Sequence, residues 1–357
     1  MGAVRVERLK CGSARRNPPR HSLSVWRSKP LTSVSDLYRS TNSAPGDDMS
    51  KKRRLEYRTS PSCSGARLIE DAAHSYGDPR TANKLIHGDN LFALQALQQG
   101  YAEKIQCICI DPPYNTGGLF KHYDDGAAHA EWLVFMRRRI KLLKNLLSKS
   151  GFFVCHIDDN ESPYLKIMLD EVFGRKNYLT TIYVRARYAD ATAKQDKDPH
   201  FHKEVEQILI YRKQLGATPN LKAGIPVQDF YDANDLGNRR IEGGIDFRGG
   251  KKPERLIRVI LEHFSKMNDY VLDCFLGSGT TAAVAHKMKR RWIGIEIGPH
   301  MKTHCLPRLR KVVDGTDKKG VSKVLRWRGG GGFRFYETVP TQGQQSVAKV
   351  GTRRIPA

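Results

Sequence analysis

A strand, a glycine turn, a helix and a second strand follow one another at residues 268–298, and this unit constrains the fold most. The stretch VLDCFLGSGTT runs as an apolar strand to Asp273 and then turns through Gly277 and Gly279. The next apolar strand, IGIEI, ends at Glu296, 23 residues after Asp273. Two strands joined by a crossover helix lie parallel in one sheet. Because strands and helices alternate along most of the chain, we predict an α/β protein with a doubly wound, mostly parallel sheet.

The glycine turn has the features of a binding loop for a nucleoside cofactor. Gly277 and Gly279 carry no Cβ atom, so the backbone can approach a ligand closely. The helix that begins near Thr280 turns its free N–H groups toward the same crevice, and Glu296 is suited to accept hydrogen bonds from both hydroxyls of a ribose. With Ala282, the spacing also satisfies the dinucleotide pattern GxGxxG/A. The loop therefore predicts a nucleoside cofactor of undefined type, and a purely structural glycine turn is the alternative.

A second motif, DPPY, follows the strongly apolar strand KIQCICI at residues 104–110. Pro112 and Pro113 lack N–H donors, so their carbonyl groups stay available as acceptors. Asp111 and a neighbouring carbonyl can then each accept one hydrogen of an exocyclic amine, and Tyr114 offers a flat face on which a base can stack. The alternative is a Pro-Pro turn with an incidental tyrosine. The motif thus predicts a clamp for the amine of a nucleobase.

An amine clamp beside a nucleoside cofactor suits methyl transfer better than hydride transfer. In S-adenosylmethionine the sulfonium activates the methyl group, and the enzyme mainly aligns nitrogen, carbon and sulfur. The formal net charge of +24 indicates a polyanionic partner such as nucleic acid, since Lys and Arg displace counterions from phosphates. A membrane surface is the other partner that this charge allows. An amine paired inside a duplex is out of reach, so the base must flip out of the helix.

The composition shows no sign of export or of a membrane span. No apolar run approaches about 18 residues, and the basic N-terminus lacks the apolar segment of a secretory signal. The chain has seven cysteines, without the paired CxxC motifs of a zinc site. We expect reduced thiols, mostly in the core, no metal ion and a cytoplasmic protein.

The chain divides by composition into tails and one large domain. Residues 1–78 are rich in Arg, Ser, Pro and Gly and show no sustained period, which predicts a basic, disordered tail. A nucleic-acid-binding arm is the alternative. The predicted domain at 79–345 comprises a half with DPPY at 79–213, a short glycine-rich insert at 214–250 and a cofactor-binding half at 251–345, followed by a tail at 346–357.

Periodicity predicts the other elements of the domain. The segment EWLVFMRRRIKLLKNLLSKSG indicates an amphipathic helix that ends at Gly151, with its basic residues, Arg139 among them, on a solvated face. Further helices are expected at SPYLKIMLDEVFG, KKPERLIRVILEHF and MKTHCLPRLRKVV, strands at LIH, GFFVCHIDD, YLTTIYVRARY, VEQILIYRK and GGGGFRFYETV, and a loop at 189–203.

Together these motifs resemble the amino-methyltransferases of DNA in their permuted β class, and most of all the modification subunits of type III restriction systems. The resemblance is carried by IHGDNLFAL, DPPYNTG, KKPERLI, DCFLGSGTT, IGIEI and the GGGGFRFYE ending, which span residues 84–339. It implies a seven-stranded, Rossmann-like, circularly permuted fold that binds S-adenosylmethionine. It also implies methylation of adenine N6, because enzymes acting on cytosine N4 more often carry Ser in place of Asp111.

The resemblance also implies roles for single residues. Asp111, Pro112, Pro113 and Tyr114 would form the catalytic clamp, and Glu296 would bind the ribose. The other implied cofactor contacts are Asp89 at the adenine ring, Lys252 and Pro253 at the methionine end, and Asp273, Phe275, Gly277, Ser278, Gly279, Thr280 and Thr281 along the glycine loop.

Partners and alternatives follow from the same resemblance. Double-stranded DNA is the expected substrate, at the nucleoid of a bacterial cytoplasm, and a homodimer is the expected assembly. A restriction subunit is a further partner of type III enzymes, although the short insert at 214–250 fits a solitary methyltransferase as well. The alternatives are methylation of cytosine N4, an RNA substrate, a NAD(P)-dependent oxidoreductase that uses the same glycine loop, and a catalytically silent relative.

Overall fold

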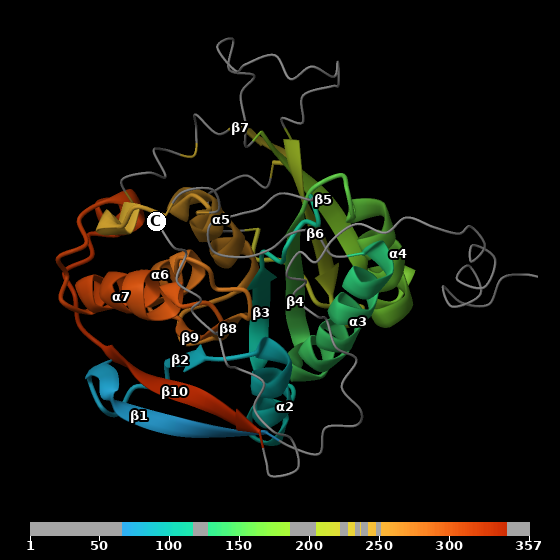
Figure 1. Cartoon of the computed structure of the whole chain (residues 1–357). Coiled ribbons are helices and arrows are strands. Elements are labelled where there is room, and N and C mark those ends of the chain that lie inside the picture. The colour runs from blue at the N-terminus through green and yellow to red at the C-terminus, as the bar shows by residue number, and fades with distance from the viewer. Residues whose placement is uncertain are drawn as a thin grey trace, which may run out of the picture. The chain divides into compact units, whose positions relative to one another are not determined.

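A computed structural model describes residues 66–116, 128–185, 205–221, 228–232, 236, 242–247 and 251–340. In these residues one ten-stranded sheet carries helices on both faces (Figure 1). In pairing order the strands are β1 (Ala66–Gly77), β10 (Gly332–Pro340), β2 (Lys84–His87), β9 (Arg291–Glu296), β8 (Tyr270–Asp273), β3 (Ile105–Ile110), β4 (Leu147–Ile157), β6 (Val205–Arg212), β5 (Tyr178–Arg185) and β7 (Phe230–Asp232). The helices are α2 (Asn90–Tyr101), α3 (His129–Leu146), α4 (Ser162–Phe173), α5 (Glu254–Phe264), α6 (Thr280–Lys287) and α7 (Leu306–Val313).

The strand directions confirm the predicted doubly wound, permuted sheet. Six of the nine strand pairs are parallel, and three are antiparallel. The unit β8-α6-β9 comes late in the chain, yet its strands lie between β2 and β3, which come early. The predicted number of seven strands was too low. The seven strands from β2 to β5 in pairing order form the middle of the sheet, while β10 and β1 extend one edge and β7 the other.

Hydrophobic side chains fill both faces of the sheet. The helices α5, α6 and α7 cover one cluster, and α2, α3 and α4 cover the other. Strand β3 serves both faces, because Cys107 and Cys109 lie in the first cluster and Ile108 and Ile110 in the second. The five cysteines of the described residues are buried and form no disulfide, as expected for reduced core thiols. None of the described helices is long and apolar enough to cross a membrane.

The predicted end of the basic helix at Gly151 was wrong. Helix α3 ends at Leu146, and β4 begins at the next residue. Gly151 lies inside β4, where a Cβ atom would come within 2.9 Å of the carbonyl oxygen of Ile105 on β3. The glycine therefore permits a close approach of two strands and does not mark the end of the helix.

The predicted N-terminal tail was wrong in its last part. Strand β1 pairs antiparallel with β10, from Ala66 opposite Pro340 to Gly77 opposite Gly332. Most β1 side chains are exposed or half-buried because the strand lies at the edge of the sheet, so its sequence carries little apolar alternation. The tails at 1–65 and 346–357 and the loop at 189–203 lie outside the described residues.

Candidate active site

Acidic residues from four neighbouring strands gather at the carboxyl edge of the sheet. Strand β3 leads into Asp111, β8 ends at Asp273, β9 ends at Glu296, and β2 is followed shortly by Asp89. These strands are adjacent in the order β2-β9-β8-β3 and parallel to one another. The parallel alignment brings the DPPY motif and the glycine loop to one edge, where ligands bind in open α/β sheets.

Asp111 belongs to a cluster of four polar side chains, Asp111, Tyr114, Glu206 and Lys252, which we call the clamp cluster. The Tyr114 hydroxyl lies 2.8 Å from Oδ1 of Asp111 and 3.2 Å from Oε2 of Glu206 on β6. Lys252 Nζ lies 2.6 Å from the Tyr114 hydroxyl and 2.6 Å from Glu206 Oε2. The same Nζ lies 3.3 Å from Oδ1 of Asp111. One ammonium group therefore contacts three acceptors from two different elements.

Burial and charge oppose each other in the clamp cluster. Burial raises the pKa of Asp111, and the Lys252 charge offsets only part of this increase. Burial lowers the pKa of Lys252, but the carboxylates of Asp111 and Glu206 outweigh it, so this pKa is raised. His156 on β4 is buried, and burial lowers its pKa to about 3. The imidazole is therefore neutral near pH 7, whereas Lys252 carries a positive charge beside Asp111.

The carbonyl groups of the Pro-Pro turn are not equivalent. The indole N–H of Trp132 on α3 donates to the Pro113 carbonyl oxygen over 2.8 Å. Pro112 lies one residue closer to Asp111, and its side chain is buried. Because Trp132 uses the Pro113 carbonyl, the Pro112 carbonyl is the better candidate for the second acceptor of an amine.

A left-handed residue redirects the chain after Tyr114. Asn115 has φ of 59°, and its side-chain amide donates to Oε1 of Glu161 over 2.7 Å. Glu161 also lies 2.9 Å from the ring Nδ1 of His129 at the start of α3. These contacts tie the end of the DPPYNT stretch to the helices on one face of the sheet. The next two residues of the motif, 117 and 118, lie outside the described residues.

The glycine loop leaves space for a ligand next to β8. Gly277 and Gly279 have left-handed φ values of 55° and 82°, which only glycine adopts without strain. A Cβ atom at Gly277 would find the Phe275 carbonyl oxygen, at 3.9 Å, as its nearest neighbour. The backbone at Gly277 is thus uncovered, and its contact with a nucleoside stays a prediction.

Glu296 is held in place by the loop that it faces. Its two carboxylate oxygens accept hydrogen bonds from the backbone N–H groups of Gly277 and Gly298, each over 2.8 Å. His300 Nε2 lies 3.2 Å from Oε1. Burial raises the pKa of Glu296, but His300 and the two N–H groups lower it further, so the net pKa is below its usual value. The carboxylate is therefore ionised, and oxygens with two lone pairs each can also accept from ribose hydroxyls.

Asp273 is the most perturbed acid of the glycine loop. Its Oδ1 accepts a hydrogen bond from the Phe275 N–H over 3.0 Å, and the Thr281 side chain also donates to it. Burial nevertheless raises its pKa to about 7, with smaller contributions from Asp111 and Glu296. Asp273 therefore changes its charge near neutral pH.

Asp89 begins α2 and is tied to the glycine loop through Asn90. Its Oδ1 accepts from the Leu91 N–H over 2.7 Å and from Arg139 Nη2 over 3.0 Å. The Asn90 side chain donates to the Cys274 carbonyl oxygen over 2.7 Å. Arg139 is buried, so its prediction on a solvated face was wrong. Helical periodicity did not reveal that this guanidinium reaches back to the first residues of α2.

The hydroxyl groups of Ser278 and Thr280 both contact the guanidinium of Arg308. Arg308 Nη1 lies 2.8 Å from Thr280 Oγ1 and 3.3 Å from Ser278 Oγ, beneath the loop. All three side chains are buried. Arg308 thus engages the hydroxyl groups of Ser278 and Thr280, and the cofactor contacts of these two residues stay a prediction.

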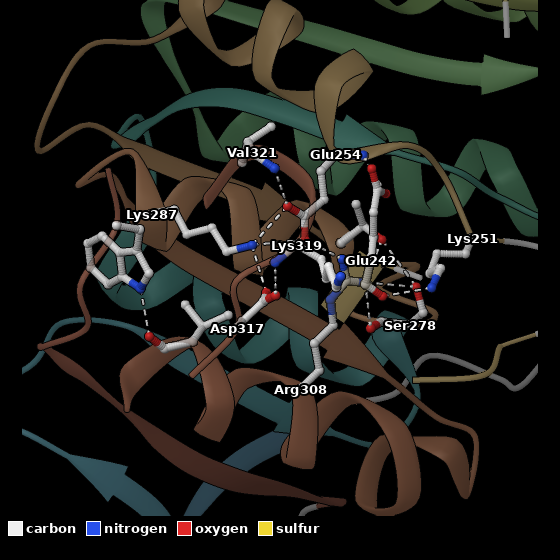
Figure 2. Close-up of polar contacts among 12 residues, drawn as sticks. Glu242, Lys251, Glu254, Ser278, Lys287, Arg308, Asp317, Lys319 and Val321 are labelled. Carbon is white, nitrogen blue, oxygen red and sulfur yellow. Dashed lines mark hydrogen bonds and ion pairs between the residues drawn. The ribbon is translucent and has the colours of Figure 1, made fainter. Parts of the chain in front are cut away.

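Arg308 belongs to a buried ion-pair network that joins the glycine loop to α5 (Figure 2). Arg308 Nη2 lies 2.7 Å from Glu254 Oε1, and Lys287 Nζ lies 2.8 Å from Glu254 Oε2. Lys287 also lies 2.7 Å from Oδ2 of Asp317. Burial raises the pKa of Glu254, but Arg308 and Lys287 reverse this effect and keep it ionised. We call Glu254, Lys287, Arg308 and Asp317 the buried network.

Hydrogen bonds to residues 242–245 hold the segment that leads into α5. The Glu254 N–H donates to Oε2 of Glu242 over 3.0 Å, and Lys251 Nζ donates to the carbonyl oxygens of Glu242 and Ile245. Pro253 supplies the carbonyl that accepts the first N–H of the helix, from Ile257. The backbone on both sides of Lys252 is therefore fixed. The fold brings Lys252 to Asp111 and Tyr114, and its position at the methionine end of the cofactor stays a prediction.

Sequence reasoning missed three charged residues that organise the site. Glu206 was assigned no role, and Glu254 and Arg308 were not singled out. The available signal was weak, because each lies in an amphipathic segment where a charge is ordinarily solvated. In the described ranges, no three His, Cys, Asp or Glu side chains gather as they would around a metal ion.

The permuted sheet, the DPPY turn and the adjacent glycine loop are the features on which the resemblance to Rossmann-like amino-methyltransferases rests. A family model described as DNA methylase, of the N6/N4 methyltransferase type, matches residues 105–305. The chain therefore belongs to the N6/N4 DNA methylase family, and the resemblance inferred from its motifs is confirmed.

Relatives of this chain include modification subunits and single methyltransferases. The "Probable type III restriction-modification enzyme HindVI Mod subunit" of Haemophilus influenzae is 29% identical over 77% of this chain and 56% of the relative. The "DNA adenine methyltransferase YhdJ" of Escherichia coli is 27% identical over 60% of this chain and 79% of the relative. The chain thus spans about half the length of the HindVI relative, and 26% of the StyLTI Mod subunit of Salmonella typhimurium.

A solved structure supports the fold. The PvuII DNA methyltransferase, described as cytosine-N4-specific, superposes with a TM-score of 0.51 and 18% sequence identity. The match covers 70% of this chain and 95% of that protein. At this identity the likeness concerns the fold alone.

Proposed function

We propose that this protein transfers the methyl group of S-adenosylmethionine to the exocyclic N6 amine of an adenine flipped out of double-stranded DNA. The observation that carries the proposal is the meeting of Asp111 with Asp273 and Glu296 at one edge of the sheet. This arrangement puts an acceptor pair for an amine beside a loop suited to a nucleoside. The name of the relative YhdJ, a DNA adenine methyltransferase, supports DNA and adenine. Cytosine N4 is the second candidate, since the PvuII enzyme is described with that specificity.

Asp111 and Pro112 orient the amine in this proposal. The Asp111 carboxylate and the Pro112 carbonyl each accept one N–H of the target, so the nitrogen lone pair points away from both. Tyr114 supports the face of the base, as aromatic side chains do for unpaired bases. As the N–C bond forms and the S–C bond breaks, the nitrogen loses one proton toward Asp111. The methyl donor would be left as a neutral thioether, so that charge and atoms balance.

The glycine loop fits the cofactor through its backbone and its acids. Gly277 offers a bare backbone, Glu296 offers an ionised carboxylate to the ribose, and Asp273 and Phe275 line the end of β8. When bound, S-adenosylmethionine supplies an electrophilic methyl group on a sulfonium. The roles of Asp89 at the adenine ring and of Pro253 remain part of this proposal.

We infer the partners of this protein from its net charge and from the proteins that it resembles. The net charge of +24 favours the DNA backbone. A homodimer and a restriction subunit are further partners that we propose, in a bacterial cytoplasm at the nucleoid. Light scattering at the concentration used for activity tests the dimer, and a monomeric mass would contradict it.

Methylation-sensitive long-read sequencing of DNA from cells that express the protein tests the function. We expect N6-methyladenine at one recurrent sequence motif, absent from cells that carry the Asp111→Ala variant. Modified cytosine at the motif would establish the second candidate. Unmodified DNA in both cultures would contradict DNA methylation. Titration with NAD and with S-adenosylmethionine separates an oxidoreductase, which would bind only the former.

Asp273 predicts a pH dependence of cofactor binding. Its pKa of about 7 means that the carboxylate is ionised above this pH and neutral below it. S-adenosylmethionine carries a sulfonium and an ammonium, so the ionised form attracts it. We expect the affinity to fall by up to about tenfold for each pH unit below about 7, as measured by calorimetric titration. The Asp273→Asn variant should bind weakly at all pH values, and an affinity of the unmodified protein that stays constant from pH 5.5 to 8 would contradict this role.

A further inference from the structure

Lys252 occupies the position from which an amine would contact Asp111. Its ammonium lies 3.3 Å from Oδ1 of Asp111, 2.6 Å from the Tyr114 hydroxyl and 2.6 Å from Glu206 Oε2. The Lys252, Asp111 and Glu206 side chains are 14%, 24% and 13% exposed, so water screens this contact only in part. The contact with Glu206 is the shorter of the two ion pairs.

The backbone keeps Lys252 in this position. Glu254, two residues later, is fully buried and is held by Arg308 and Lys287. On the other side, Lys251 donates to two carbonyl oxygens. Glu206 is held through β6, where it pairs with Val184 of β5 and where its neighbour Gln207 pairs with Ile157 of β4. The ion pair is therefore built from the rigid part of the fold.

We propose that Lys252 and Glu206 are positioning residues that set the ionisation of Asp111 and reserve its place for the target amine. When the base enters, the contact of Lys252 with Asp111 breaks and its contact with Glu206 remains. The Asp111 carboxylate is then ionised and in position to accept from the target amine. This inference rests on the proposed methyl transfer and deepens it. Neither residue was given this role by the sequence motifs.

The physical reason is a balance of like and opposite charges around Asp111. A cation within about 4–6 Å favours an ionised carboxylate, and an anion disfavours it. The titratable groups that face Asp111 are Tyr114 on its own loop, Lys252 before α5, Glu206 on β6, Asp273 at the end of β8, and the thiols of Cys155 on β4 and Cys109 on β3. The neutral His156 on β4 faces Lys252 and Glu206. Without the cation, Asp111 and Glu206 would be two partly buried acids bridged by one phenol.

Such a bridged pair would retain a proton. A protonated Asp111 keeps one carbonyl acceptor but donates from its other oxygen, so it cannot take the proton of the target amine. The rate of methyl transfer should therefore rise with pH as Asp111 ionises. The lower-pH side of the rate profile, which we call the acid limb, reports on this ionisation.

Two substitutions move the acid limb in opposite directions. In Lys252→Met the cation is lost and Glu206 remains, so Asp111 ionises at a higher pH and the acid limb moves to higher pH. In Glu206→Gln the anion is lost and Lys252 remains, so the acid limb moves to lower pH. We expect shifts of about one pH unit each. The double variant should return toward the unmodified protein, and Lys252→Arg should stay close to it.

Single-turnover methylation of duplex DNA, with the cofactor saturating at every pH, measures the acid limb. Saturation removes the contribution of Asp273 to cofactor binding. The matched control is Lys213→Met, which breaks an ion pair of 3.1 Å with Glu103 outside the clamp cluster and should leave the profile unchanged. Shifts of the two variants in the same direction, or unshifted profiles, would overturn the proposal.

A second measurement does not depend on activity. In the full-length protein with 13C-labelled Asp carboxyl groups, the Asp111 signal is identified by its loss in Asp111→Asn. Its titration midpoint should rise in Lys252→Met, or in Lys252→Gln if the first variant does not fold, and should fall in Glu206→Gln. If the protein methylates no DNA but these midpoints move as expected, the charge pair stands and the proposed reaction fails. Unchanged midpoints would overturn the charge pair itself.

Discussion

Replacing Asp111 by Ala should lower the single-turnover rate of DNA methylation on the order of 10²–10⁴-fold, the range expected when a group that accepts the reacting proton is lost. The carboxylate is the acceptor that both orients the amine and takes its proton. Cofactor affinity should change little, because the glycine loop and Glu296 hold their own contacts without Asp111. Rapid-quench methylation and calorimetric titration with S-adenosylmethionine measure the two quantities.

Asp314→Ala is the matched control for Asp111→Ala. Asp314 is an exposed acid after α7, and its loss should leave the methylation rate unchanged. Asp111→Asn keeps an oxygen acceptor but no charge, so it should fall between the unmodified protein and the Ala variant. An Asp111→Ala protein that is fully active would rule out the amine clamp.

Replacing Glu254 by Ala should lower the free energy of unfolding by about 3–5 kcal/mol, the typical cost of removing one partner from a buried ion pair. Glu254 lies between Lys287 and Arg308, and the three side chains are fully buried. Without Glu254, Asp317 alone remains as the acid of the buried network. Urea unfolding followed by circular dichroism measures the change.

The exposed ion pair between Arg137 and Glu171 provides the control for Glu254→Ala. Glu171→Ala should cost no more than about 1 kcal/mol, because water screens the pair. If the two variants were equally stable, Glu254 would not hold the start of α5 as the buried network implies. A second consequence of the Glu254→Ala change is a misplaced Lys252, which methylation assays below the unfolding midpoint would detect.

The central fold was predictable because its signals are local. Apolar runs such as KIQCICI and the glycine turn after VLDC define strands and a crossover helix within about 30 residues. Strand β1 was not predictable in this way, because it is an edge strand in which no side chain is buried. The end of α3 was missed because the segment carries apolar residues across its junction with β4.

The residues of the candidate site likewise divide into those that local sequence signals reveal and those that depend on distant contacts. Asp111, Asp273 and Glu296 were found because each ends or directly follows an apolar strand, and the parallel order of the strands brings them together. Arg139 and Arg308 were missed as buried residues. A buried arginine looks like any solvated one in a sequence, because its partners, Asp89 and Glu254 among them, lie about 50 residues away.

By itself, the sequence determined the motifs of the two loops, their order along the chain and the alternation of strands and helices, since each depends on residues close together in the chain. Only the tertiary structure decided that Lys252 meets Asp111 and Glu206, and that Arg308 joins Glu254 to the glycine loop. These contacts depend on which side chains a folded sheet brings within reach. Their effect depends on how far burial excludes water from the charges, which local sequence does not encode.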